Sequence, residues 1–227
     1  TAKIISGFAS ALIVRTFAQS DVDELGAHST IPVLNGLTDT DHPTQLLADW
    51  LTIREVFGSD VSGRKFTYVG DGNNMAHAWL TMGAIMGAHV VVATPDGKWA
   101  PAKDAIQSAK NIASKTGAKI EVLTDPEAAA KDASVLYTDV WMSMGDPEEV
   151  RTEKLKALAP FAITKNLMSL TASDSIFMHC LPAHRGEEVA AEVIDGPKSV
   201  IWREAFHRRT TIQAVLYHLV RGELTGN

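Results

Sequence analysis

Cysteine is almost absent from this chain of 227 residues, which contains Cys180 alone. A single thiol excludes an intramolecular disulfide framework and is typical of proteins from a reducing compartment. A zinc site built on several cysteines is excluded for the same reason, and the histidines do not have the spacing of zinc ligands. We therefore predict a cytoplasmic protein without a zinc site.

Long apolar runs and an excess of positive charge are missing as well. No apolar stretch reaches the roughly 18 residues that a membrane-spanning helix needs, and the first residues lack the basic-then-apolar order of a secretory signal. The formal net charge of -6 disfavours a nucleic-acid partner, because binding to a phosphate backbone needs a basic surface. With 45% hydrophobic residues the chain can bury a sizeable core, and small-molecule chemistry is the expected function.

The order of the apolar runs predicts an α/β protein with a doubly wound parallel sheet, because short β-type runs alternate with helical segments. These runs lie near residues 66–69, 89–93, 119–123, 135–137 and 175–178. Upstream, β-rich runs at residues 11–17 and 31–35 predict part of a second α/β unit. Helical spacing predicts a connecting helix from Pro43 to the residue before Gly58, and a terminal helix over residues 205–221. Ligands of such sheets bind beyond the carboxyl ends of the strands.

A first polar cluster surrounds the predicted start of the connecting helix. His42 precedes that start and Gln45 lies in the first turn, where both could face a carbonyl or phosphate oxygen. The alternative is that Asp41 caps the helix and the histidine is incidental.

A second cluster is the glycine-rich turn at residues 70–75. It matches the dinucleotide-binding fingerprint only in part, because Met75 stands where the third glycine is needed and no clear ribose-binding acid ends the next strand. Asn73 and Asn74 instead offer amides that can hold a carboxylate or an ammonium group. The alternative is that they merely tolerate a left-handed turn.

Two further clusters follow predicted strands. Asp139 ends one strand and could bind an ammonium group, while Ser143 and Met144 in the next loop could enclose an aliphatic amino acid. Cys180 ends another strand beside His179. A buried, inert cysteine is the usual case, and no sequence feature indicates a lowered thiol pKa, so we assign no covalent nucleophile.

Together these segments resemble the transcarbamoylase family, and the later ones resemble ornithine carbamoyltransferase in particular. The family's His-Pro-x-Gln element stands at residues 42–45, its Asp-x-x-x-Ser-Met-Gly loop at residues 139–145 and its His-Cys-Leu-Pro element at residues 179–182. Aspartate carbamoyltransferases resemble the chain only in the first of these elements.

The resemblance implies a set of residues for each substrate. The carbamoyl phosphate site would comprise Arg15 on the phosphate, His42 and Gln45 on the carbamoyl group, and Cys180, Leu181 and Arg208 around them. The α-amino and α-carboxylate groups of ornithine would contact Asn74, Asp139, Ser143 and Met144. The residues nearest the reaction would be Cys180, His42 and Arg208.

The implied reaction is transfer of the carbamoyl group to the δ-amine of L-ornithine, which gives L-citrulline and phosphate in a step of the arginine-biosynthesis or urea-cycle type. It needs no metal or organic cofactor, and positioning and electrostatic stabilisation would supply most of the catalysis. Family members are usually trimers, so the resemblance also implies a homotrimer. It further implies four parts. Residues 1–41 would be the remnant of the carbamoyl phosphate domain and residues 42–58 the interdomain helix. Residues 59–204 would form the ornithine-binding domain, and residues 205–227 a C-terminal helix packed back on the first domain.

One family element is not in the sequence. The phosphate-binding Ser-x-Arg-Thr-Arg lies upstream of the matched segment in the family, and the only similar stretch here surrounds Arg15 in a different predicted strand. Because bidentate arginine contacts dominate phosphate recognition, we expect a chain that has lost the first part of its N-terminal domain to be nearly inactive alone. It should also be poorly stable, with apolar edges exposed at residues 11–17 and 31–35.

Other functions are open on the sequence alone. A transcarbamoylase for putrescine or an acylated ornithine is the nearest, although Asp139 with the Ser-Met-Gly loop favours a free α-amino acid. A non-catalytic amino-acid-binding fragment would fit the missing phosphate element, and a dinucleotide oxidoreductase is the most distant alternative.

Overall fold

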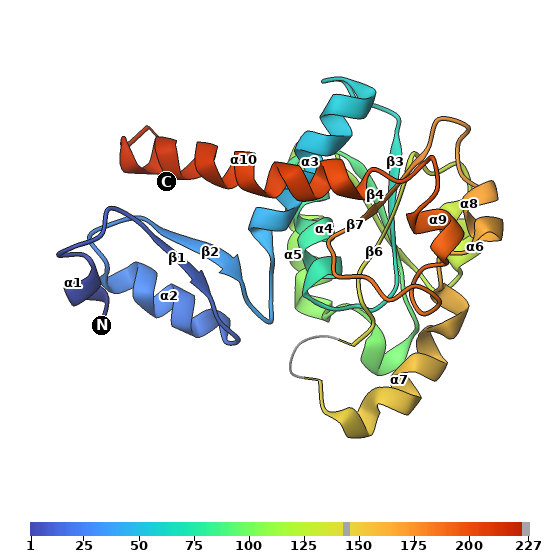
Figure 1. The fold of residues 1–227 in the computed structure, drawn as a ribbon, viewed down its shortest axis with the longest axis horizontal. Coiled ribbons are helices and arrows are strands. Elements are labelled where there is room, and N and C mark those ends of the chain that lie inside the picture. Colours follow the sequence, from blue (N-terminus) through green and yellow to red (C-terminus); the bar gives the residue numbers. More distant parts are fainter. Residues whose placement is uncertain (143–145, 224–227) are drawn as a thin grey trace.

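The computed structural model describes residues 1–142 and 146–223, and its strands form a large and a small parallel sheet (Figure 1). The large sheet has five strands in the order β5-β4-β3-β6-β7, and the small sheet pairs β1 with β2. The strands are β1 (Leu12–Arg15), β2 (Val33–Leu37), β3 (Lys65–Val69), β4 (His89–Ala93), β5 (Lys119–Leu123), β6 (Val135–Thr138) and β7 (Ile176–His179). Each neighbouring pair is parallel, which confirms the predicted doubly wound sheet and the partial second unit.

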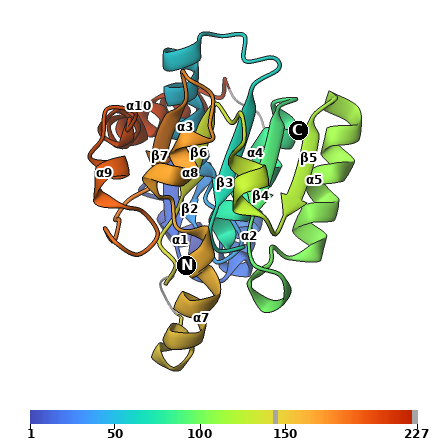
Figure 2. The ribbon, with the colours of Figure 1, turned by 90° about the vertical axis from the view of Figure 1, so that its right-hand side faces the viewer.

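Helices connect these strands and cover both faces of the large sheet, as Figure 2 shows. They are α1 (Ala2–Ile5), α2 (Gln19–His28), α3 (Pro43–Phe57), α4 (Asn74–Ile85), α5 (Lys103–Thr116), α6 (Pro126–Ala130), α7 (Arg151–Leu158), α8 (Lys165–Ser169), α9 (Ala191–Ile194) and α10 (Ile201–Val220). Short 3-10 turns lie at Gly97–Trp99, Glu148–Val150 and Ala159–Phe161. Within the described residues, no helix is both long and apolar enough to cross a membrane.

The core divides into two layers because side chains of a strand point alternately to opposite faces. In β4, Val90 and Val92 pack with Trp79 of α4 on one face, whereas Val91 and Ala93 pack on the other face, where α6, α8 and α9 lie. After His89, the residues of β4 are therefore apolar without alternation, as expected for a strand buried on both sides.

The connecting helix α3 begins and ends where the sequence predicts. Pro43 occupies its first turn, where a missing N–H costs nothing, and Gly58 follows its end with a φ of 87°. That left-handed conformation favours glycine over any residue with a Cβ atom.

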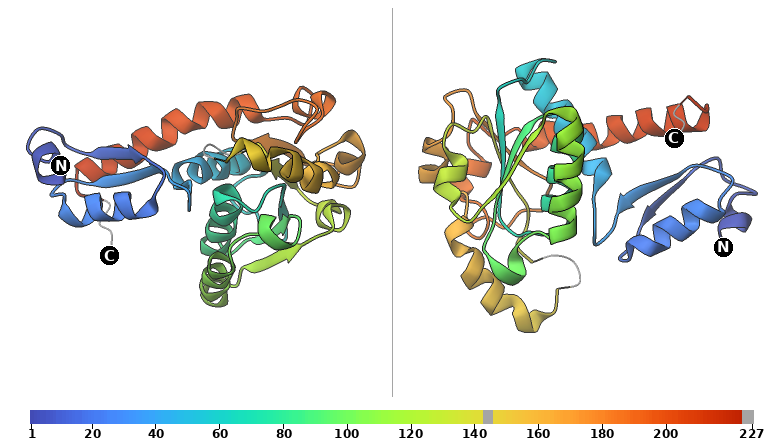
Figure 3. Two further views of the ribbon diagram at one scale, coloured as in Figure 1. Left: turned by 90° about the horizontal axis from the view of Figure 1, so that it is seen from below. Right: turned by 180° about the vertical axis from the view of Figure 1, so that it is seen from behind.

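The last helix differs from its prediction, since α10 begins at Ile201 rather than at residue 205. Ile201 and Glu204 are both buried on one side of the helix. Because the buried Glu204 interrupts the apolar pattern, the sequence does not reveal that the helix already begins at Ile201. Helix α10 packs along α3 and extends past the large sheet toward the small one (Figure 3).

The small sheet is less completely covered. Ile13 of β1 and the following Phe17 are 44% and 64% exposed, which confirms the expected apolar edge at residues 11–17. Residues 31–35 are half-buried instead. The strand β2 starts at Val33, after Pro32, because proline cannot donate a hydrogen bond to a neighbouring strand.

Candidate active site

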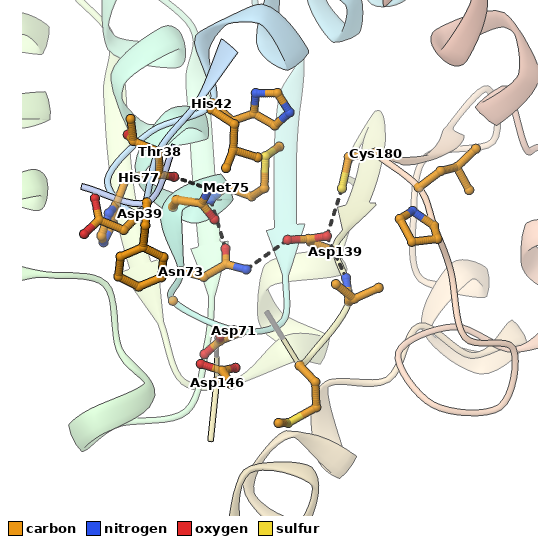
Figure 4. Close-up of a pocket in the computed structure, with 18 of the residues that line it drawn as sticks. Thr38, Asp39, His42, Asp71, Asn73, Met75, His77, Asp139, Asp146 and Cys180 are labelled. Atoms are coloured by element: carbon orange, nitrogen blue, oxygen red, sulfur yellow. Dashed lines mark hydrogen bonds between the residues drawn. The ribbon is translucent and has the colours of Figure 1, made fainter. Parts of the chain in front are cut away.

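A pocket of about 870 Å³ opens at the carboxyl end of β3, β6 and β7, where residues that follow the strands of the small sheet also line it (Figure 4). The location agrees with the rule for open parallel sheets. Among the residues that line it are Arg15, His42, Asn74, Asp139, Cys180, Leu181 and Arg208, all expected there from the sequence. Segments far apart in the chain thus converge on a single pocket.

Asp139 lies at the centre of the polar contacts in Figure 4. Its Oδ1 accepts hydrogen bonds from the thiol of Cys180 at 2.9 Å and from the backbone N–H of Val140 at 2.7 Å, and its Oδ2 accepts one from Asn73 Nδ2 at 2.9 Å. Burial, followed by the charge of Asp139, raises the pKa of Cys180 well above its usual value. The thiol is therefore protonated at neutral pH, which agrees with its not being a covalent nucleophile.

The two asparagines of the glycine-rich turn have different contacts. Asn73 caps α4 by accepting hydrogen bonds from the backbone N–H groups of Met75 and Ala76. Asn74 lines the pocket and donates to the backbone oxygen of Thr38 at 2.9 Å, which connects α4 to the segment after β2. Neither asparagine has a positive φ, so the alternative of a left-handed turn is wrong. The contact of Asn73 with Asp139 was not predicted.

His42 is the residue directly before α3 and is buried beside the pocket. Its Nδ1 lies 3.4 Å from the hydroxyl of Thr44. Burial, the charge of Arg208 and then that of Arg15 lower the pKa of His42 to about 3, so the ring is neutral. The alternative in which Asp41 caps α3 is wrong, because its carboxylate accepts a hydrogen bond from His42 N–H rather than from the first turn.

Gln45 is buried and does not line the pocket wall directly. Its side-chain oxygen instead accepts a hydrogen bond from the guanidinium of Arg208, which does line the pocket. Arg208 thus faces the pocket and Gln45 lies behind it, whereas the sequence predicts that Gln45 itself contacts the carbamoyl group.

The loop after β7 is held from inside the protein. His179 is fully buried, with Nε2 lying 3.3 Å from Glu188 Oε1, and its Nδ1 accepts a hydrogen bond from Leu181 N–H at 2.9 Å. Leu181 has a φ of 58°, a conformation uncommon for a residue with a branched side chain. These contacts fix the direction in which Cys180 and Leu181 face the pocket.

Sequence analysis missed an ion cluster at the pocket rim. Lys154 of α7 is buried and lies 2.6 Å from both Asp71 and Asp146, and its ammonium stands 5.2 Å from the centre of the Trp99 ring. Figure 4 shows the two carboxylates side by side. Asp71 stands two residues after the end of β3, and its position in the glycine-rich turn was the available sequence indication.

Two predicted ornithine contacts, Ser143 and Met144, lie outside the described residues. As for metals, His184, Glu187 and Glu188 offer ligand atoms within 4.8 Å of one another. Arg151, however, pairs with Glu187 at 3.2 Å, and its positive charge opposes a cation at that position.

Comparison with known proteins identifies the class first. The family model described as the aspartate/ornithine carbamoyltransferase Asp/Orn binding domain matches residues 62–219, and that of the carbamoyl-P binding domain matches residues 1–55. The parallel sheet with its pocket, together with these paired matches, defines a transferase of the carbamoyltransferase class.

Individual relatives narrow the class further. The ornithine carbamoyltransferase of Pyrococcus horikoshii is 47% identical over 226 residues, which is 100% of this chain and 70% of the relative. The solved ornithine carbamoyltransferase of Pyrococcus furiosus superposes with a TM-score of 0.91 at 46% identity, covering 99% of this chain and 70% of that one. The solved anabolic enzyme of Campylobacter jejuni gives 0.92 at 34% identity, covering 97% and 72%. The chain belongs to the ornithine carbamoyltransferase family.

Proposed function

We propose that this chain transfers the carbamoyl group of carbamoyl phosphate to the δ-amine of L-ornithine, giving L-citrulline and phosphate. The observation that carries the proposal is the convergence of Asp139, Cys180, His42 and Arg208, from four separate segments, on one pocket at the sheet edge. Relatives that match 97% to 100% of the chain are named for the same activity.

The acceptor end of the pocket suits a zwitterionic amino acid. Asp139 is 8% exposed and can accept a further hydrogen bond from an ammonium group, while Asn74 can approach a carboxylate with its amide. A charge-assisted contact to a buried carboxylate is stronger than a neutral one, so an α-amino group is favoured over an acylated nitrogen. We assign Asn74, Asp139, Ser143 and Met144 to ornithine, with Asn73 holding Asp139 in place.

The donor end combines cationic and neutral donors. Arg15 and Arg208 supply positive charge for a phosphate, and the neutral ring of His42 can donate a hydrogen bond to the carbamoyl oxygen without adding charge. As the amine attacks the carbamoyl carbon, charge grows on that oxygen and on the leaving phosphate. Donors already fixed in place stabilise it without reorganisation. We assign Arg15, His42, Cys180, Leu181 and Arg208 to this end, with Gln45 behind Arg208 as the residue that holds its guanidinium in place.

The Cys180 thiol has a defined part in this arrangement. It is protonated and donates to Asp139, so it places a polarisable, uncharged group beside the carboxylate that binds the acceptor. The attacking amine must lose a proton to be nucleophilic, and a site without a free thiolate avoids a competing nucleophile.

A putrescine or acylornithine carbamoyltransferase is the second candidate, and acceptor specificity decides between them. The test is release of phosphate, with the carbamoylated product identified by mass spectrometry, by residues 1–227 joined to the upstream Ser-x-Arg-Thr-Arg segment of a relative, with ornithine, putrescine and N-acetylornithine supplied in parallel. We expect the joined protein to turn over rapidly with ornithine and not with the other two acceptors. We expect slow turnover when the 227-residue chain is assayed without the added segment. Equal or greater turnover with either other acceptor would contradict the proposal, whereas rapid turnover by the chain alone would contradict only the expected need for the added segment.

The remaining predictions concern organisation. A homotrimer, a cytoplasmic location and the division at residues 41, 58 and 204 are consistent with the family and stay predictions. Gel filtration with light scattering would test the trimer.

A further inference from the structure

Two buried carboxyl groups lie behind the donor end of the pocket, where the proposed reaction does not use them. Asp49 of α3 and Glu204 of α10 are both fully buried, although acidic residues are rarely buried without a partner. In each helix the acid stands four residues from a proposed carbamoyl phosphate residue, Gln45 in α3 and Arg208 in α10. Residues at this spacing share one helix face, so the four side chains meet where α3 and α10 pack together (Figure 1).

Gln45 is the residue that joins the two acids. Its Nε2 donates to Asp49 Oδ1 at 2.7 Å and to Glu204 Oε1 at 3.1 Å, while its oxygen accepts from Arg208. Every hydrogen-bonding group of this amide is thus used inside the protein. The orientation of Gln45, and through it that of Arg208, depends on both carboxyl groups.

Glu204 also reaches the acceptor side of the site. Its Oε2 accepts a hydrogen bond of 3.0 Å from the backbone N–H of His179, the residue before Cys180. A single carboxyl group therefore contacts both the amide behind Arg208 and the end of strand β7, from which the Cys180 loop starts.

The charge balance of this cluster requires one proton on the acids. Two ionised carboxylates beside one guanidinium would leave a buried net charge, which is costly in a medium of low dielectric constant. Burial raises the pKa of Glu204 well above its usual value, and the charge of Asp49 raises it further. Burial also raises the pKa of Asp49, to about 7. With one proton the pair carries a single negative charge, which Arg208 balances.

Hydrogen bonding also indicates the position of that proton. Asp49 Oδ2 is buried and has no hydrogen-bond partner among the residues that the structure describes. An interaction between the two carboxyl groups lowers the pKa of Asp49 and raises that of Glu204, the effect expected when Glu204 donates a proton to Asp49. The other titratable groups that face the pair are Tyr137 and Cys180, and burial raises the pKa of both, so they are neutral.

We propose that Asp49 and Glu204 are positioning residues, a carboxyl pair sharing one proton, which orients Gln45 and Arg208 at the donor end and fixes the start of the Cys180 loop. This inference rests on the proposed function for the assignment of Gln45 and Arg208. The existence of the shared proton does not, because it concerns the protein without substrate. Loss of the proton would place two adjacent negative charges beside Gln45 and disturb both ends of the site together.

Asp49→Asn is the informative variant. Its oxygen can still accept from Gln45, and its NH2 group can donate to Glu204 in place of the shared proton, so the pair keeps its geometry and loses its titration. Glu55→Gln is the matched control, since Glu55 also joins α3 to α10 through Arg203 at 2.6 Å but lies at the exposed side.

The experiment is a pH titration of the uniformly ¹⁵N-labelled chain, followed by NMR at the Gln45 side-chain amide and the His179 backbone amide. We expect both signals to shift together in one transition, at a pH above the ordinary range of carboxyl groups, in the original chain and in Glu55→Gln, and to stay constant in Asp49→Asn. Infrared spectroscopy should show a protonated carboxyl band in the original chain that disappears in the same transition. The two wild-type measurements stand even if the variant does not fold.

Absence of a common titration, or its survival in Asp49→Asn, would overturn the inference. In the citrulline assay, Asp49→Leu should raise the KM for carbamoyl phosphate roughly tenfold, which is the effect of one lost hydrogen bond to a charged group. Asp49→Asn keeps that hydrogen bond and should have the KM of the original chain. If no citrulline forms but the NMR titration is present, the proposed function fails and the proton-sharing pair stands.

Discussion

Cys180 and Asp139, separated by 41 positions in the chain, are joined by a 2.9 Å hydrogen bond from the thiol to Oδ1. Each residue directly follows a strand of the large sheet, and β6 and β7 are neighbours, so the parallel arrangement alone brings the two side chains together. The carboxylate gains a donor and the thiol keeps its proton. The carboxylate can therefore accept a hydrogen bond from an ammonium group, and no thiolate competes with the attacking amine.

The first prediction concerns the reactivity of Cys180. Because burial and Asp139 raise its pKa, the thiolate fraction at pH 8 is small, and alkylation by iodoacetamide should be at least roughly tenfold slower than that of free cysteine. Intact-mass measurement reads this rate directly, since the chain has no other cysteine. The same chain unfolded in urea serves as its own control. Alkylation of the folded protein at the rate of the unfolded one would contradict the assignment.

The positions of Asp139 and Cys180 could be predicted from the sequence, whereas the buried charged residues around the pocket, such as Lys154 and Glu204, could not. Apolar runs followed by Asp139 and Cys180 mark the carboxyl ends of strands, and the parallel-sheet rule places such residues at one edge. Nothing in the local pattern distinguishes Lys154 from its exposed neighbours in α7, because burial of a lysine depends on acids supplied by other segments. Likewise, the sequence indicates an exposed polar position at Glu204, so the start of α10 is predicted too late in the chain.

The second prediction concerns the protonation of His42. Its pKa in the folded protein is about 3, below the ordinary value of 6.5, so folding favours the neutral ring. The resulting contribution to stability is fully present above pH 6.5 and is lost as the pH falls toward 3, because the unfolded chain then binds a proton that the folded chain does not. NMR of the ring should show no titration of His42 between pH 8 and 5.

In His42→Asn the melting temperature should fall less steeply than in the original chain as the pH is lowered from 6.5 to 4.5. An ordinary titration of His42 near pH 6.5 would contradict the neutral-donor role.

The third prediction concerns the ion cluster at the rim. Lys154→Met removes the partner of the buried Asp71, and breaking a buried ion pair in this way should destabilise the protein by about 3 kcal/mol. Urea unfolding measures this change in the free energy of unfolding. The matched control is Lys156→Met, two positions further along α7 at an exposed site, which should change it by less than about 0.5 kcal/mol.

The double variant Lys154→Met with Asp71→Asn separates charge from packing. If the loss in Lys154→Met comes from the uncompensated carboxylate, neutralising Asp71 should recover part of it. Equal destabilisation by Lys154→Met and Lys156→Met would show that the cluster does not contribute.

The central claim is that Asp139 and its neighbours form a site for a free α-amino acid. Isothermal titration of L-ornithine into the 227-residue chain tests it most directly, since the match to the Asp/Orn binding domain spans residues 62–219 and binding can be measured without turnover. We predict saturable binding of ornithine, much weaker binding of putrescine and N-acetylornithine, and a loss of roughly tenfold or more in Asp139→Asn, with Asp104→Asn on the exposed start of α5 unchanged. Binding of ornithine that is no tighter than that of putrescine, or that is unaffected in Asp139→Asn, would contradict the account.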